Sequence, residues 1–203
     1  MKWNLTPRSL LRLFALTATA ALALPATAQD TSILKPPKGS KVALVVFEDL
    51  QCPDCRRAAP LLQDAVKAYK IPLVRYDFPL PQHNWSFDAH VMARWFDTKS
   101  KAIGNEFRDH IFENQLQVTR ENLRGYAERF AAQKKLALPF LVDPTGALAA
   151  KVKADVNLGK RTGVSHTPTI YVVSETTTGA PFVEVVDRTQ LFALIDEMKR
   201  QAR

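Results

Sequence analysis

The first strand-like pattern in the chain is an unbroken apolar run from Val42 to Phe47, and after it the hydrophobic spacing alternates between that of helices and that of strands. Such a run is typical of a strand that is buried on both faces. A helix is predicted to follow from Pro53, because the first turn of a helix tolerates proline. A second strand is predicted at residues 72–78, ended by Pro79 and Pro81. The apolar face of the helix would consist of Ala58, Leu61, Leu62, Ala65 and Ala68.

From about Ser86 to Leu138 the apolar residues recur three or four positions apart, which predicts a block of helices. A further helix is predicted to begin with Asp143 as its N-cap and Pro144 as its first residue, and to end by Gly163. The stripes of the helical block favour core packing over a ligand site. They comprise Phe87, Val91, Trp95, Ile103, Phe107, Ile111, Leu123, Tyr126 and Phe130.

Strand patterns return at residues 169–173 and 182–186, separated by a polar turn at 174–179. Asp187, with Gln190 three residues later, predicts the start of a final helix. The apolar face of that helix would consist of Leu191, Leu194, Ile195 and Met198. This order of elements indicates an α/β fold, in which an all-helical insertion at about residues 83–163 separates the two halves of a small central sheet.

The N-terminal 28 residues have the pattern of a secretory signal peptide. Three basic residues precede an apolar run at 13–24, and the small residues Ala26 and Ala28 place the expected cleavage after position 28. The run is shorter than the ~20 residues that a membrane-spanning helix needs. We therefore expect a linker at 29–41, one domain at 42–200 and an oxidising, periplasmic location.

The formal net charge of +8 falls to +5 once residues 1–28 are removed. The basic pairs Arg56-Arg57, Lys134-Lys135 and Lys160-Arg161 are scattered along the chain, with acidic residues between them. This distribution favours a solvated surface and disfavours a nucleic-acid partner.

Cys52 and Cys55 are the only cysteines, and they lie between the first predicted strand and its helix. A disulfide across so short a loop stabilises a fold by only ~2 kcal/mol, against ~4.7 kcal/mol for a hundred-residue loop. A redox role is therefore favoured over a structural or vestigial pair. Cys52, at the helix N-terminus, is predicted to attack, because unpaired N–H groups and the helix dipole stabilise its thiolate. Cys55, one turn further, would resolve the mixed disulfide.

Besides a redox pair and a structural pair, the two cysteines could form part of a zinc site. His83, His90, His110 and His166 show no paired spacing, and an exported pair of this kind is ordinarily oxidised. We expect no metal, and no cofactor beyond the redox-active disulfide itself.

Three residues near the cysteines are expected to tune their redox properties: Pro53, Asp54 and His166. The charge of Asp54 should destabilise a neighbouring thiolate and make the protein a milder oxidant. His166, two residues before Pro168, either approaches the cysteines or belongs to the plain surface, and the sequence leaves both readings open.

The segments Phe47–Cys55 and Gly163–Ile170, together with the helical block, resemble the DsbA-like branch of the thioredoxin superfamily over residues 42–200. The resemblance implies a thioredoxin-like fold with a cis bond between Thr167 and Pro168, facing the cysteines. The backbone of Thr167 would then pair with an extended client segment.

One departure from that family is Val46, where many relatives carry a buried acidic residue. Glu48 and Asp49 remain candidates for relaying protons to Cys55. The resemblance implies a monomer that oxidises thiols of exported polypeptides and is served by a membrane redox partner. The alternatives are a reductase fed by a membrane partner and a redox-inert peptide-binding module.

Overall fold

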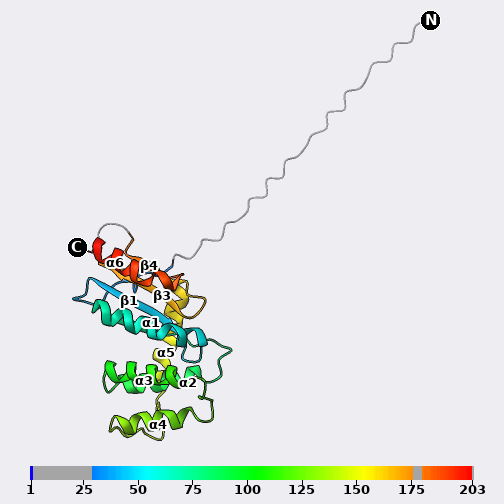
Figure 1. The fold of residues 1–203 in the computed structure, drawn as a ribbon. Coiled ribbons are helices and arrows are strands. Elements are labelled where there is room, and N and C mark those ends of the chain that lie inside the picture. Colours follow the sequence, from blue (N-terminus) through cyan, green and yellow to red (C-terminus); the bar gives the residue numbers. More distant parts are fainter. Residues whose placement is uncertain (2–28, 176–179, 203) are drawn as a thin grey trace.

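The computed structural model describes Met1 and residues 29–175 and 180–202, and within them the chain forms a four-stranded sheet surrounded by helices (Figure 1). The strands are β1 (Val42–Glu48), β2 (Leu73–Asp77), β3 (Thr169–Ser174) and β4 (Phe182–Glu184). Their spatial order is β2-β1-β3-β4. β1 pairs with β2 in parallel, whereas β3 runs antiparallel to both β1 and β4. β1 is therefore an inner strand, as its unbroken apolar run predicted.

Helices cover both faces of this sheet. They are α1 (Pro53–Tyr69), α2 (Ser86–Asp97), α3 (Lys101–Asn114), α4 (Leu123–Gln133), α5 (Ala147–Thr162) and α6 (Leu191–Gln201). The side chains of β1 alternate between two cores, because successive residues of a strand point to opposite faces. Leu44 and Val46 share a core with α1 and α6, whereas Val45 and Phe47 lie in the core that Val156 of α5 contacts.

Gly159 explains how closely α5 approaches the sheet. A Cβ atom at this position would lie 2.7 Å from the ring of Phe78 and 3.0 Å from that of Phe47. α5 continues through Gly159 and ends at Gly163, whose φ of 90° closes the helix in the left-handed conformation.

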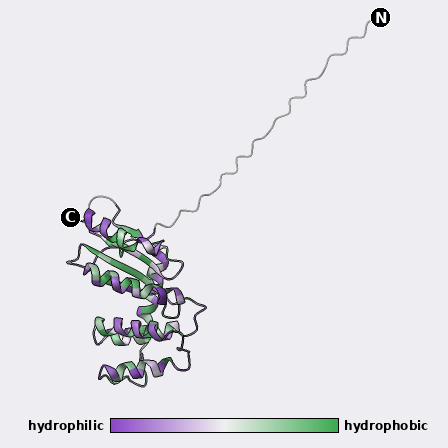
Figure 2. Cartoon of the chain, viewed as in Figure 1, coloured by the Kyte–Doolittle hydropathy of each residue, from purple (hydrophilic) through white to green (hydrophobic). Residues whose placement is uncertain are grey.

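The predicted helical insertion is confirmed: α2, α3 and α4 form a second lobe below the sheet, with α3 and α2 stacked on α4, whereas α5 packs against the sheet (Figure 1). Its core holds most of the predicted stripes, including Trp95, Phe107 and Phe130. The same cluster also contains Cys52 and Cys55, so the cysteines lie where the two lobes meet. In Figure 2 the strands of the sheet are strongly hydrophobic, whereas the helices alternate between hydrophobic and hydrophilic residues.

Three predicted boundaries were wrong. α5 begins at Ala147 rather than Pro144, because Gly146 adopts a left-handed conformation with φ 74°. Asp143 still caps this helix, since its carboxylate accepts from the backbone N–H groups of Leu148 and Ala149 at 3.1 and 2.8 Å. β4 ends at Glu184, two residues before the predicted position.

The third wrong boundary is the start of the last helix. Asp187 accepts a hydrogen bond from the backbone N–H of Thr189 at 2.9 Å and caps a 3₁₀ turn, Arg188–Gln190, that precedes α6. The Gln190 side chain donates to the Thr189 hydroxyl, whereas in a capping box it would accept from the backbone N–H of Asp187.

The predicted signal peptide at 1–28 and most of the turn at 174–179 lie outside the described residues. Within the described part of the chain, no helix is both long enough and apolar enough to cross a membrane.

Of the three basic pairs expected on a solvated surface, Lys134-Lys135 and Lys160-Arg161 are exposed, whereas in Arg56-Arg57 only Arg57 is exposed and Arg56 is partly buried. Two arginines outside these pairs, Arg75 and Arg108, have side chains that are 6% and 1% exposed. Both are buried because they meet carboxylates between the sheet and the helical lobe.

Candidate active site

The cysteine pair lies at the start of α1. Cys52 is the N-cap residue, with an extended backbone (φ −73°, ψ 120°), and Pro53 is the first helical residue. Both cysteines are free thiols in this structure. Both are buried, Cys55 (2% exposed) more deeply than Cys52 (7% exposed).

The Cys52 thiol donates a hydrogen bond to the backbone carbonyl oxygen of Thr167 at 3.4 Å. The bond between Thr167 and Pro168 is cis, in agreement with the expectation from the resemblance. The pKa of Cys52 is lowered to about 5, chiefly by a hydrogen bond from the Cys55 side chain, and further by the Thr167 side chain and by backbone N–H groups of the helix. These interactions outweigh burial, which opposes ionisation.

Cys55 behaves in the opposite way. Its pKa is raised well above the ordinary value, first because burial penalises the charged form and then because the Cys52 sulfur lies beside it. The Cys55 sulfur accepts a hydrogen bond from the backbone N–H of Asp49 at 3.4 Å. One sulfur of the pair thus favours the thiolate and the other favours the thiol.

The charge of Asp54 is compensated by two arginines, so Asp54 is not the isolated carboxylate that the sequence suggested. Its Oδ1 atom lies 3.1 Å from Arg57 and 2.8 Å from Arg188. Burial opposes ionisation of Asp54, but the hydrogen bonds and charges of Arg188 and Arg57 hold its pKa below the ordinary value.

His166 is exposed, and its backbone carbonyl accepts a hydrogen bond from the Thr169 hydroxyl at 2.7 Å. Its side chain lines a groove of about 310 Å³ together with Asp54, Pro168 and Arg188. His166 therefore borders the surface beside the cysteines, and its role in the chemistry stays a prediction.

Gln115 is a site residue that the sequence did not reveal. It is 6% exposed, directly after α3, and its Nε2 atom donates to the backbone carbonyls of Leu50 and Cys52 at 2.8 and 3.0 Å. The helical lobe thereby holds the loop that carries the attacking cysteine. No local pattern distinguishes this glutamine from the exposed Gln117 two residues later.

Asp49 is occupied by four hydrogen bonds that fix the loop before the cysteines. Its Oδ1 atom accepts from the backbone of Gln51 and the hydroxyl of Ser86, and its Oδ2 atom accepts from the backbone of Leu80 and contacts His83 Nδ1. With both carboxylate oxygens engaged in this way, Asp49 acts mainly as a scaffold of the site.

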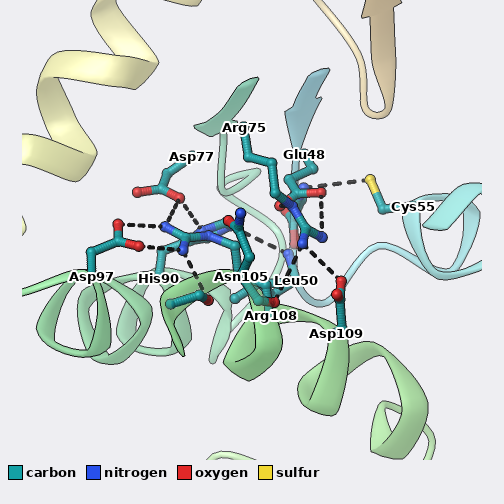
Figure 3. Close-up of polar contacts among 12 residues, drawn as sticks. Glu48, Leu50, Cys55, Arg75, Asp77, His90, Asp97, Asn105, Arg108 and Asp109 are labelled. Atoms are coloured by element: carbon teal, nitrogen blue, oxygen red, sulfur yellow. Dashed lines mark hydrogen bonds and ion pairs between the residues drawn. The ribbon is translucent and has the colours of Figure 1, made fainter. Parts of the chain in front are cut away.

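Glu48 lies in a separate buried ion pair. Its carboxylate contacts Arg75 at 2.7 and 3.2 Å, and Arg75 in turn contacts Asp109 of α3 at 2.7 Å (Figure 3). The Glu48 charge contributes to the raised pKa of Cys55. Of the two acidic candidates, Glu48 therefore acts on Cys55 electrostatically, and proton relay by either residue stays a prediction.

A second ionic cluster surrounds Asp77 at the end of β2 (Figure 3). The fully buried Asp77 carboxylate contacts His90, Arg94 and Arg108. His90 accepts from the backbone N–H of Leu50 through Nε2 at 3.3 Å, so the neutral ring carries its proton on Nδ1 and donates it to Asp77. The cluster therefore supports the loop that leads to Cys52.

Among the described residues, no group of three or more His, Cys, Asp or Glu side chains is arranged to hold a metal ion. The chemistry that the arrangement offers is that of the dithiol.

A sequence model of the family described as thioredoxin matches residues 36–189. The chain belongs to the thioredoxin family. Its DsbA-like fold is shared by solved structures of low sequence identity. Wolbachia pipientis alpha-DsbA1 aligns with a TM-score of 0.66 and 15% identity, covering 89% of this chain and 96% of that one.

Two further relatives complete the comparison. The thiol-disulfide exchange protein alpha-DsbA2 of the same organism aligns with a TM-score of 0.62 and 18% identity, over 81% of this chain and 85% of that one. A curated relative, Na(+)/H(+) antiporter NhaA 1 of Salinispora arenicola, is 27% identical over 149 residues. That match covers 70% of this thioredoxin-family chain but only 22% of the antiporter.

Proposed function

We propose that this thioredoxin-family protein is a periplasmic thiol:disulfide oxidoreductase that oxidises the thiols of exported polypeptides. The observation that carries the proposal is the asymmetry of the two cysteines. Cys52 lies at a helix N-terminus with a pKa lowered to about 5, while Cys55 is buried behind it with a raised pKa. This is the arrangement that separates an attacking thiolate from a resolving thiol.

In the oxidising direction the protein starts with a Cys52–Cys55 disulfide. A client thiolate attacks Cys52, forming a mixed disulfide and releasing Cys55 as the leaving group, which takes up a proton. A second client thiolate then attacks the client sulfur of the mixed disulfide, and Cys52 leaves as a thiolate. The client loses two electrons and gains a disulfide, and the protein gains those two electrons as a dithiol.

The same asymmetry supports the oxidising direction. Interactions that stabilise the Cys52 thiolate stabilise the reduced protein, and a stable reduced form makes the disulfide a stronger oxidant. A membrane redox partner would restore the disulfide, with Cys52 attacking the partner's disulfide and Cys55 resolving the intermediate. The protein acts as a monomer in this proposal.

The groove beside Cys52 supports a polypeptide client. Thr167 and Pro168 enter β3 next to the attacking sulfur, and the groove continues along Val185 and Val186 beyond β4. An extended client segment would pair with the Thr167 backbone there, in the manner of an added strand.

The test is equilibration of the 52/55 pair with glutathione at neutral pH, combined with oxidation of a reduced, unfolded two-cysteine peptide. A potential between about −120 and −180 mV and stoichiometric peptide oxidation would support the proposal, because this is the range of disulfide donors. A potential near about −270 mV would favour the reductase. If Cys52→Ser kept the full biological effect of the wild type, the protein would instead be a redox-inert binding module.

A further inference from the structure

Arg188 reaches the active-site helix from the far end of the chain. It lies in the 3₁₀ turn before α6, 134 positions after Asp54. Its Nη2 atom contacts Asp54 Oδ1 at 2.8 Å, and its Nη1 atom donates to the Asp54 backbone carbonyl at 3.4 Å. The guanidinium therefore holds both the side chain and the backbone of a residue that lies between the two cysteines.

The direction in which the Asp54 carboxylate points affects the chemistry of Cys52. A negative charge near a thiolate disfavours it, and the effect falls with distance. Arg188 holds the carboxylate at the wall of the groove that Pro168 and His166 also line. The other acidic side chain lining this groove is Glu184.

Arg57 also contacts Asp54, but in a different setting. It lies on the same helix three residues later, at 3.1 Å, and its side chain is 61% exposed. The Arg188 side chain is 35% exposed and makes the shorter contact. An exposed pair within a helix contributes little, so Arg188 is the partner better suited to fix the carboxylate.

We propose that Arg188 is a positioning residue for thiol:disulfide exchange, which holds the Asp54 carboxylate in an ion pair at the wall of the groove and thereby limits its destabilising effect on the Cys52 thiolate. The inference rests on the proposed function and deepens it. It makes the segment between β4 and α6 part of the redox machinery, although that segment carries no cysteine.

The test compares Arg188→Gln with the wild type in two measurements on the full chain. One is the equilibrium constant for the reaction in which the protein disulfide and two glutathione thiols become the protein dithiol and glutathione disulfide. The other is the thiol pKa of Cys52, taken from the pH dependence of its alkylation. The variant should show a two- to fivefold smaller equilibrium constant, in keeping with a partly exposed charge pair, and a higher Cys52 pKa.

A double-mutant cycle with Asp54→Asn separates positioning from the direct charge of the arginine. Without the carboxylate, Arg188→Gln should change both quantities by less than half as much as it does in the wild type. Arg188→Lys keeps the positive charge and is the control for a folding defect in Arg188→Gln. Its equilibrium constant with glutathione should lie closer to that of the wild type than the constant of Arg188→Gln does. The matched controls are Arg57→Gln, at the same carboxylate, and Arg161→Gln, remote from it, and both should show smaller changes.

An unchanged constant in Arg188→Gln, or an equal change in the Asp54→Asn background, would overturn the inference while leaving the proposed function intact. If the wild type itself did not exchange with glutathione, the proposed function would be wrong, so the two failures are distinguishable.

Discussion

The sulfur of Cys52 lies 3.4 Å from the backbone carbonyl oxygen of Thr167, although 115 positions separate the two residues in the chain. This contact joins the two halves of the sheet at the site, because Cys52 follows β1 and Thr167 precedes β3. It places the attacking sulfur beside the backbone that a client segment would contact.

Alkylation should distinguish the two cysteines. A short iodoacetamide pulse at about pH 6 is expected to label Cys52 in the reduced protein well before Cys55, because only Cys52 is substantially ionised there. Peptide mapping gives the ratio. In denatured protein the two cysteines should be labelled at similar rates, and preferential labelling of Cys55 in the folded protein would contradict the assigned roles.

The stability of the reduced protein should depend on pH through Cys52. Its folded pKa of about 5 lies below the ordinary value near ~8.5, so the thiolate stabilises the folded dithiol most fully above ~8.5. This contribution is lost as the pH falls through about 5, while Cys55 stays protonated over that window. The melting temperature of the reduced form minus that of the oxidised form should therefore fall between pH 8 and pH 5.

The control for this dependence is Cys52→Ser, which has no thiolate, so its melting temperature minus that of the oxidised wild type should change little between pH 8 and pH 5. If the variant kept the same pH dependence as the reduced wild type, groups other than Cys52 would be responsible.

Gln115 should contribute measurably to the stability of the fold, although it lies just beyond the end of α3. Gln115→Ala removes the donor to two buried carbonyls, and an unsatisfied buried group costs about 1–3 kcal/mol. Urea unfolding should therefore show a loss of that order, with faster exchange of the backbone amides around Leu50. Gln117→Ala is the matched control and should leave stability within ~0.5 kcal/mol. Equal effects of the two variants would exclude the proposed support.

Asp77 should be the most sensitive acidic residue of the fold. Asp77→Asn removes one carboxylate from Arg94 and Arg108, which keep ion pairs to Asp97 and, for Arg94, to Asp155. We therefore expect a loss at the lower end of the about 3–5 kcal/mol that a broken buried ion pair costs. The free energy of unfolding in urea measures the loss, and the exposed Asp64→Asn on α1 is the control. A loss below about 1 kcal/mol would show that the cluster contributes little net stability.

The sequence by itself determined the order of the elements and the place of the cysteines. The unbroken run at 42–47 gave an inner strand, Pro53 marked the first residue of α1, and the stripes around Phe107 and Phe130 formed the core of the helical lobe. These features can be predicted because they depend on local backbone preferences and on hydrophobic periodicity, and both are visible within a short stretch of sequence.

Tertiary structure alone decided which polar residues serve the site. Gln115 and Arg188 look like ordinary surface residues in the sequence, yet both contact the cysteine segment. Asp77 supports the loop before Cys52 indirectly, through His90, which contacts Leu50. The start of α5 likewise depended on the left-handed Gly146 rather than on Pro144. These roles arise when elements far apart in the chain are brought together, because a buried polar group is stable only where distant partners satisfy its hydrogen bonds and charge.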